Sequence, residues 1–365
     1  METSIAFDPS QCERRRKCEG DRITREMTSM TSHRALLAVV LVLQAFLIAT
    51  PAQAEDIFVA TTRAALSGPT SADTAPQYYL HYDMEVRADR RPGQYIDQFV
   101  TKVSRRISTL GSFAREVVGY SRARFGTSEV VVIVHGYNTT FWTSQMRATQ
   151  LAVDMDIPAA TIQFSWPNAH NLVAYDADLG RARQAELALE TLLVGLTRAG
   201  ASRVVVVGHS MGADIVMHTL ARMRQHGSNQ FFARFGGAAL LSPDMPIVEF
   251  KAALSNLRAP VVIYSSSKDW VLDLVAGMSD QQVRVGSVHD SSAFDGLPLM
   301  VVDTANSLSG GMVAHYAVGG QPDLMAMINA MAKPDLIGFA QALIRNSDGH
   351  DLQSSGNTVV VQLPR

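Results

Sequence analysis

The ten residues RVVVVGHSMG, at positions 203–212, decide how this chain is expected to fold. Their valine run suits a short parallel strand that is buried on both faces. The residues after it read G-x-S-x-G, and a segment with helical spacing follows up to Gln225. A turn this sharp strains the serine backbone, and Gly208 and Gly212 remove the side chains that would clash there. The motif therefore predicts that Ser210 presents its hydroxyl at the end of a strand and at the N-terminus of a helix.

The same alternation of apolar strands and helical segments extends over most of the chain. Strands are predicted at residues 57–62, 78–86, 129–134, 160–166, 203–207, 237–241, 260–264 and 299–303, with an edge strand at 358–363. Helices are predicted at residues 96–125, 141–155, 174–199, 212–225, 245–256, 323–332 and 336–345. This alternation indicates βαβ units and a mostly parallel central sheet with helices on both faces. Ligands bind such sheets at the carboxyl ends of the strands, so the residues after each strand form the candidate site.

Ser210 is the candidate nucleophile, and acyl transfer would also need two N–H donors for the developing oxyanion. One donor is expected from Met211, the residue after the serine. The other is expected from the loop after an earlier strand, where the sequence HGYN at 135–138 places the N–H of Tyr137. His135 precedes Ser210 in the chain, whereas the base is expected after it. We therefore interpret His135 as a residue that orders this loop.

A serine hydroxyl is a weak nucleophile until a base takes its proton. In this order of elements the base comes last in the chain. His315 is the preferred base because it lies in the loop after the last predicted central strand. His289, in a loop before that strand, is the alternative.

The base in turn needs a carboxylate that orients it. Asp269 is the preferred acid because it follows the strand at 260–264 through the residues SSSK. Asp244 follows the preceding strand and is the main alternative acid. Asp273 and Asp303 are further alternatives, although aspartates at turns and helix ends are common without any catalytic role.

Residues 1–54 are predicted to be a leader that contains a secretory signal peptide. Residues 35–48 form an apolar run of roughly 14 residues, whereas about 20 are needed to span a bilayer. The following AQA, at 52–54, has the small-x-small pattern of a cleavage site, which predicts a cut between Ala54 and Glu55. The mature protein would then be periplasmic or secreted. The alternative is an uncleaved leader that anchors the chain to the membrane. The protein is expected to contact the membrane only through such a leader.

The segment at 1–26 is longer than a signal peptide requires. Such a peptide would begin near Met27 or Met30, so we interpret the earlier residues as the product of a start codon assigned too far upstream. The alternative is a real, extended cytoplasmic region before the signal peptide.

Residues 55–365 are expected to form a single domain, and their composition argues against several classes of function. The whole chain has a formal net charge of −2, without the basic excess of a nucleic-acid binder. Both cysteines, Cys12 and Cys18, lie in the leader, so the exported chain would have no disulfide. Their C-x5-C spacing has no partner pair, so no metal site is predicted. No cofactor is predicted either.

Several motifs together resemble a known family. DIFVATTR, VHGYN, FSWP, GHSMG, SPD and SSKD occur in this order between residues 56 and 269, and Tyr175 opens the long helix between them. They resemble the bacterial alpha/beta hydrolases of unknown function called DUF900, over most of residues 56–330. The resemblance implies an α/β-hydrolase fold and a triad of Ser210, Asp269 and His315. It also implies a carboxylester or related acyl substrate, either a small molecule or a lipid.

Two functions of different class are consistent with these residues. The first is a serine hydrolase that works through an acyl-enzyme, without a metal or a cofactor. The second is a catalytically silent protein of the same fold that binds or scaffolds other components of the envelope. The complete set of nucleophile, acid and base favours the enzyme.

Overall fold

The computed structural model of the chain describes residues 53–64, 66, 74–86, 93, 100–171, 174–255, 257, 259–278, 282–288, 291–295, 297–305, 315–316, 352–355 and 358–362. Three predictions lie outside these residues: most of the leader, the alternative base His289, and the helices at 323–332 and 336–345.

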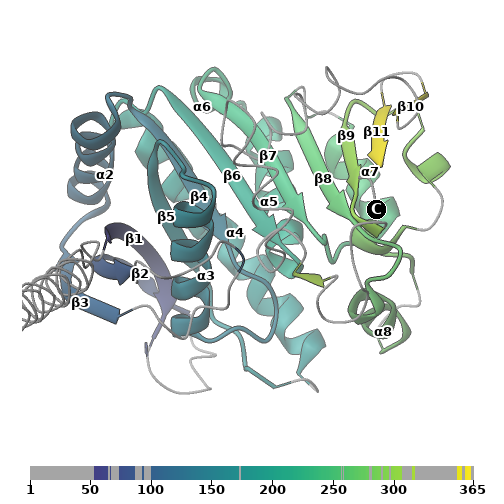
Figure 1. The fold of residues 1–365 in the computed structure, drawn as a ribbon, viewed down its shortest axis with the longest axis horizontal. Coiled ribbons are helices and arrows are strands. Elements are labelled where there is room, and N and C mark those ends of the chain that lie inside the picture. Colours follow the sequence, from purple (N-terminus) through teal and green to yellow (C-terminus); the bar gives the residue numbers. More distant parts are fainter. Residues whose placement is uncertain are drawn as a thin grey trace, which may run out of the picture. The chain divides into compact units, whose positions relative to one another are not determined.

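The described strands form one sheet with the order β10-β11-β9-β8-β7-β6-β4-β5-β1-β2-β3 (Figure 1). All neighbours from β1 to β11 in this order pair in parallel, and β2, β3 and β10 are antiparallel additions at the two ends. The bounds are β1 (Gln53–Arg63), β2 (Thr74–Val86), β3 (Val100–Ile107), β4 (Glu129–Val134), β5 (Ala160–Ser165), β6 (Arg203–His209), β7 (Phe235–Leu241), β8 (Val261–Ser265), β9 (Met300–Asp303), β10 (Leu352–Ser355) and β11 (Thr358–Gln362).

The valine runs of β4 and β6 are buried on both faces of this sheet. Their even-numbered residues, such as Val132 and Val206, join the larger core cluster, and their odd-numbered residues, such as Val131 and Val205, join a second cluster. Because successive side chains of a strand point to opposite faces, a strand covered on both sides must be apolar at every position. The sequence prediction of a central, doubly covered sheet is therefore confirmed.

Helices supply both covering layers. The larger cluster contains side chains of α2, α4, α5 and α7, and the second contains side chains of α3. The helices are α2 (Leu110–Phe125), α3 (Phe141–Asp154), α4 (Tyr175–Arg198), α5 (Met211–Gln225), α6 (Asn229–Phe232), α7 (Ile247–Leu254) and α8 (Trp270–Met278). No described helix has the length and apolar character required to cross a bilayer.

The helix predicted over residues 96–125 is wrong in its first part. Residues Val100–Ile107 form β3, which pairs antiparallel with β2, and only Leu110–Phe125 is helical. Thr109 marks the boundary, because its side chain accepts a hydrogen bond from the N–H of Ser112 and so caps α2. Pairing with a strand that is distant in sequence overrides the local helical spacing, as is common for β structure.

The strand predicted at 358–363 is present as β11, but it is not an edge strand. It lies between β9 and β10, and β10 forms the edge instead. The α8 helix was not predicted either, although it follows directly after the candidate acid Asp269.

Candidate active site

Ser210 lies at the turn between β6 and α5 with a strained backbone. Its φ of 53° and ψ of −126° are unusual for a residue with a side chain, and such conformations cost about 1–3 kcal/mol. Surrounding hydrogen bonds hold it there: its N–H donates to the Leu241 carbonyl (2.9 Å), and its carbonyl accepts from the N–H of Ala213 (2.9 Å). The structure thus has the strand-turn-helix geometry that the G-x-S-x-G motif predicts.

We call this turn, residues 208–212, the elbow. Glycines allow the elbow to pack closely against its neighbours. A Cβ atom on Gly212 would lie 2.4 Å from the Val134 carbonyl oxygen, and one on Gly208 would lie 2.6 Å from the Ala213 Cα. On the opposite side, a Cβ on Gly136 would lie 2.8 Å from the Ser210 Cβ. The elbow therefore lies in direct contact with the loop that follows β4, and only glycine allows that approach.

His315 and Asp269 are joined by a hydrogen bond between His315 Nδ1 and Asp269 Oδ2, at 2.9 Å. Both side chains are buried. Asp269 follows β8 and precedes α8, and its other carboxylate oxygen accepts from the N–H of Leu272 (3.4 Å). Because a carboxylate accepts hydrogen bonds, Nδ1 carries the proton, and Nε2 of His315 is left with its lone pair.

His209 connects the elbow to His315. Its Nε2 hydrogen bonds with the His315 carbonyl oxygen at 2.9 Å, and the two imidazole rings meet edge to face with centroids 4.9 Å apart. The Ser210 hydroxyl makes no hydrogen bond with any residue that the structure describes. The serine and His315 thus lie in adjoining segments, and catalytic hydrogen bonds are often long in free enzymes.

Asp244, the alternative acid, faces a different set of groups. Its Oδ2 accepts from the Tyr175 hydroxyl (2.9 Å), and its Oδ1 lies 3.4 Å from Arg284 Nε. Burial raises the pKa of this carboxyl group to about 6, although Arg284 opposes the shift. The structure therefore brings Asp269, not Asp244, to His315. Asp244 instead supports the elbow, because its N–H donates to the Ser210 carbonyl (3.2 Å).

The two backbone N–H groups predicted as oxyanion donors are not used within the described structure. Met211 is the first residue of α5, and its N–H donates to no described residue; the same holds for Tyr137 in the loop after β4. The first N–H groups of any helix have no partner within the helix, so the N–H of Met211 is free to bond elsewhere.

His135 lies in the same loop and orders it. Its ring stacks on the indole of Trp166 with centroids 5.2 Å apart, and its Nδ1 bonds with the Gly136 carbonyl oxygen at 2.9 Å. Burial and the neighbouring Arg63 cation hold the pKa of His135 well below its usual range. A histidine kept neutral and bonded in this way is a structural residue.

A cavity of about 380 Å³ opens beside these groups. Backbone strain is concentrated around it, because its lining includes three residues with positive φ, Asn138, His170 and Ser242. His315 and Tyr316 line one side, and α3 lines another. Its other lining residues include Gly136, Thr143, Ser144, Arg147, Leu151, His209, Leu241 and Tyr264.

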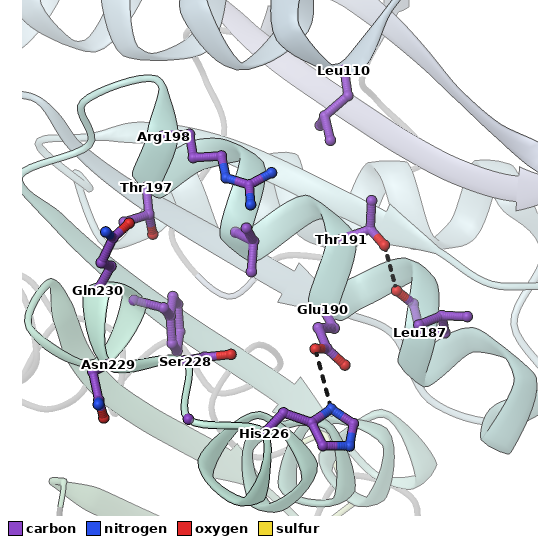
Figure 2. Close-up of a pocket in the computed structure, with 13 residues that line it drawn as sticks. Leu110, Leu187, Glu190, Thr191, Thr197, Arg198, His226, Ser228, Asn229 and Gln230 are labelled. Atoms are coloured by element: carbon purple, nitrogen blue, oxygen red, sulfur yellow. Dashed lines mark hydrogen bonds and ion pairs between the residues drawn. The ribbon is translucent and has the colours of Figure 1, made fainter.

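A more open groove of about 590 Å³ lies elsewhere, between α4 and the segment after α5 (Figure 2). Glu190 and His226 face each other across it, with Glu190 Oε1 3.8 Å from His226 Nδ1. The groove adjoins the far end of α5, which at 1.5 Å per residue is about 20 Å from Ser210. It contains none of the predicted site residues.

One group of side chains has the spacing of a metal site. Donor atoms of Asp214, His218 and Glu249 lie within 4.8 Å of one another. Arg183 contacts all three, donating to Asp214 Oδ2 (2.8 Å) and Glu249 Oε2 (3.2 Å) and lying 2.6 Å from His218 Nδ1. Since this guanidinium already balances the carboxylates, the group is an ion-pair cluster.

The chain is similar to one protein family and to several solved structures. Residues 117–331 match a family model described as alpha/beta hydrolase of unknown function (DUF900). Esterase Est22 is 14% identical with a TM-score of 0.37, over 84% of this chain and 88% of that chain. Dienelactone hydrolase from Anabaena variabilis is 13% identical with a TM-score of 0.34, over 73% and 94%. Aspergillus fumigatus lipase B is 15% identical with a TM-score of 0.36, over 65% and 67%. No curated protein matched the chain.

Packing at the elbow leads to a prediction about Gly212. We expect Gly212→Ala to lower the free energy of unfolding by about 1–3 kcal/mol, because its Cβ would overlap the Val134 carbonyl. The matched control is Gly119→Ala in α2, where no atom lies within 4 Å, and which should gain about 0.5–1 kcal/mol. Urea unfolding of both variants measures the difference, and equal effects at the two positions would contradict the close contact.

Burial of His209 leads to a prediction about acid stability. Burial lowers the pKa of His209 from 6.5 to about 3. Between these values the unfolded chain binds a proton that the folded chain does not, so stability is lost as the pH falls from 6.5 towards 3. We expect His209→Gln to reduce the slope of unfolding free energy against pH by up to about 1.4 kcal/mol per pH unit in this window. Urea unfolding across the window tests this, and an unchanged slope would show that His209 titrates normally.

Proposed function

This chain belongs to the family of alpha/beta hydrolases of unknown function (DUF900), and from that premise we propose that it is a serine hydrolase that cleaves a carboxylester or related acyl bond. One observation carries the proposal: next to the strained Ser210, His209 contacts His315, and His315 is hydrogen bonded to the buried carboxylate of Asp269. An α/β-hydrolase fold alone hosts many functions, so the argument depends on this site.

In the first step, Ser210 Oγ attacks the acyl carbonyl carbon while His315 Nε2 takes the hydroxyl proton. The new C–O bond forms as the carbonyl π electrons move to the oxygen. The proton on Nδ1 stays there, held by the bond to Asp269 (2.9 Å). The Asp269 carboxylate then stabilises the imidazolium that results and keeps the ring in the productive orientation.

The negative oxygen of the tetrahedral intermediate would accept hydrogen bonds from the N–H groups of Met211 and Tyr137. Loss of one such donor typically costs about 3 kcal/mol in the transition state. Met211 also places the oxygen at the N-terminus of α5, where the helix dipole favours negative charge. Neither N–H group is bonded to a described acceptor that it would have to leave before it binds the oxyanion.

The second half of the reaction repeats these steps with water. The intermediate collapses, the C–O bond to the leaving group breaks, and His315 gives its proton to the departing alcohol. Water then attacks the acyl-enzyme and loses a proton to His315. When this second intermediate collapses, the bond to Ser210 Oγ breaks, His315 returns the proton to Oγ, and the acid is released. These steps need no reactant other than the ester and water.

We propose a small-molecule or lipid ester as substrate. The cavity of about 380 Å³ beside His315 is the proposed substrate pocket.

We propose that the protein acts after export. The predicted cut between Ala54 and Glu55 falls near the start of β1, which begins at Gln53. A chain beginning at Glu55 would keep the pairing of Glu55 with Met84 and all later pairs of β1 with β2. The cut would therefore remove only the first two pairs of β1 with β2.

Substitution of the triad tests the proposed reaction. Ser210→Ala should abolish both hydrolysis of p-nitrophenyl esters and labelling by a fluorophosphonate probe. His315→Gln and Asp269→Asn should lower kcat by about 10³-fold or more, because the hydroxyl loses its base or the base loses its orientation. A panel of short and long acyl chains would define the preferred substrate.

The control for Asp269 is Asp273→Asn, an exposed aspartate one turn later in α8, which should keep wild-type activity. Folded wild-type protein that neither hydrolyses any ester nor reacts with the probe would support the silent binding protein instead.

The site of leader cleavage has its own test. N-terminal sequencing of the exported protein should give Glu55 as the first residue. A membrane-bound product that retains residues 35–48 would show that the leader is an anchor.

A further inference from the structure

Arg63, the last residue of β1, contacts the loop that carries the oxyanion donor Tyr137. We propose that Arg63 is a positioning residue that aims the Tyr137 N–H through His135. This inference rests on the proposed function. Arg63 also lies outside residues 117–331, the part of the chain that matches the family model.

The guanidinium of Arg63 binds both sides of the Tyr137 segment. Its Nη2 lies 2.8 Å from the Thr139 carbonyl oxygen and 3.2 Å from His135 Nε2. Thr139 follows Tyr137 by two residues, and His135 precedes it by two. The Nε of Arg63 donates to Ser165 Oγ at 2.8 Å, which ties the same segment to the end of β5. One side chain thus holds three points around the loop.

These contacts determine which nitrogen of His135 carries the proton. Arg63 has only donors, so His135 Nε2 must accept, and the N–H of Trp166 donates to the same nitrogen at 3.2 Å. The proton is therefore on Nδ1, from which it is donated to the Gly136 carbonyl oxygen at 2.9 Å.

The Gly136 carbonyl and the Tyr137 N–H belong to one peptide group. That group is planar, so the direction of its C=O fixes the direction of its N–H. By holding the oxygen of this peptide, His135 aims the opposite N–H, which is the proposed oxyanion donor. Arg63 and the Trp166 N–H together set the tautomer of His135 that makes this possible.

The burial of Arg63 indicates that this arrangement is specific. The residue is 4% exposed, and its guanidinium hydrogen bonds with two uncharged oxygens and an imidazole nitrogen. Burying a cation is costly unless it is well bonded, and Asp178 is the nearby acid that favours its charge. A planar guanidinium can bind several groups at fixed angles, whereas a lysine ammonium of the same charge cannot.

The test compares Arg63→Lys with the wild type, and with Arg105→Lys as a matched control at a half-exposed position on β3. In Arg63→Lys we expect kcat for a p-nitrophenyl ester to fall by about 10- to 100-fold with little change in KM, since the oxyanion forms only after substrate has bound. The affinity for a boronic acid, which forms a tetrahedral adduct on Ser210, should fall in parallel. Arg105→Lys should match the wild type in both measurements.

A second measurement does not need activity. In ¹⁵N NMR spectra, wild-type His135 should show a protonated Nδ1 and an unprotonated Nε2, and Arg63→Lys should shift the amide signals of Gly136 and Tyr137. The positioning role is overturned if the wild type is active and Arg63→Lys has the same kcat. It is also overturned if the apparent kcat of Arg63→Lys falls only in proportion to its fraction of folded protein. Should the wild type prove inactive, the proposed function fails, and unchanged amide signals in Arg63→Lys would then overturn this inference independently.

Discussion

The positive φ of Ser210 is the constraint on which the rest of the site depends. A side chain in that conformation is unfavourable by itself, so the surroundings must hold it. The parallel neighbour β7 supplies the acceptor for the serine N–H, and the glycines at 136, 208 and 212 allow backbone to approach from three directions. The serine thereby lies just after the carboxyl end of β6, and Asp269 likewise lies between the carboxyl end of β8 and α8. The energy stored in the turn comes from the packing of the sheet around it.

Charge distribution then gives the histidines around the cavity different properties. His135 and His209 are held neutral by burial, which lowers the pKa of each. Among the described histidines that line the cavity, His315 is bonded to a carboxylate, that of Asp269. Asp244, although equally buried, is occupied by Tyr175 and Arg284. The same residue types therefore divide into a histidine bonded to an aspartate and a set of residues that hold the surrounding loops, according to what each side chain faces.

Supporting contacts come from parts of the chain that local sequence cannot relate to one another. Arg63 precedes His135 by 72 residues and Ser165 by 102, yet it hydrogen bonds with both, because β1 pairs with β5 and β5 pairs with β4. Tyr175 likewise reaches Asp244 across 69 residues, and its ring meets Tyr137 edge to face at 5.3 Å. The start of a helix gives no sign of such a contact, so sequence patterns did not indicate it. The sequence did single out both residues, Arg63 as the end of the DIFVATTR motif and Tyr175 as the residue that opens the long helix.

By itself the sequence determined the alternation of strands and helices, the central position of β4 and β6, and the sharp turn at Ser210. These features follow from local chemistry: runs of β-branched residues buried on two faces, and glycines where a side chain cannot fit. Tertiary structure alone decided that Val100–Ile107 forms a strand, that β10 and not β11 is the edge, and which aspartate faces His315. Each of those outcomes depends on a partner distant in sequence, and the pairing energy of such a partner exceeds the small local preferences that a sequence pattern records.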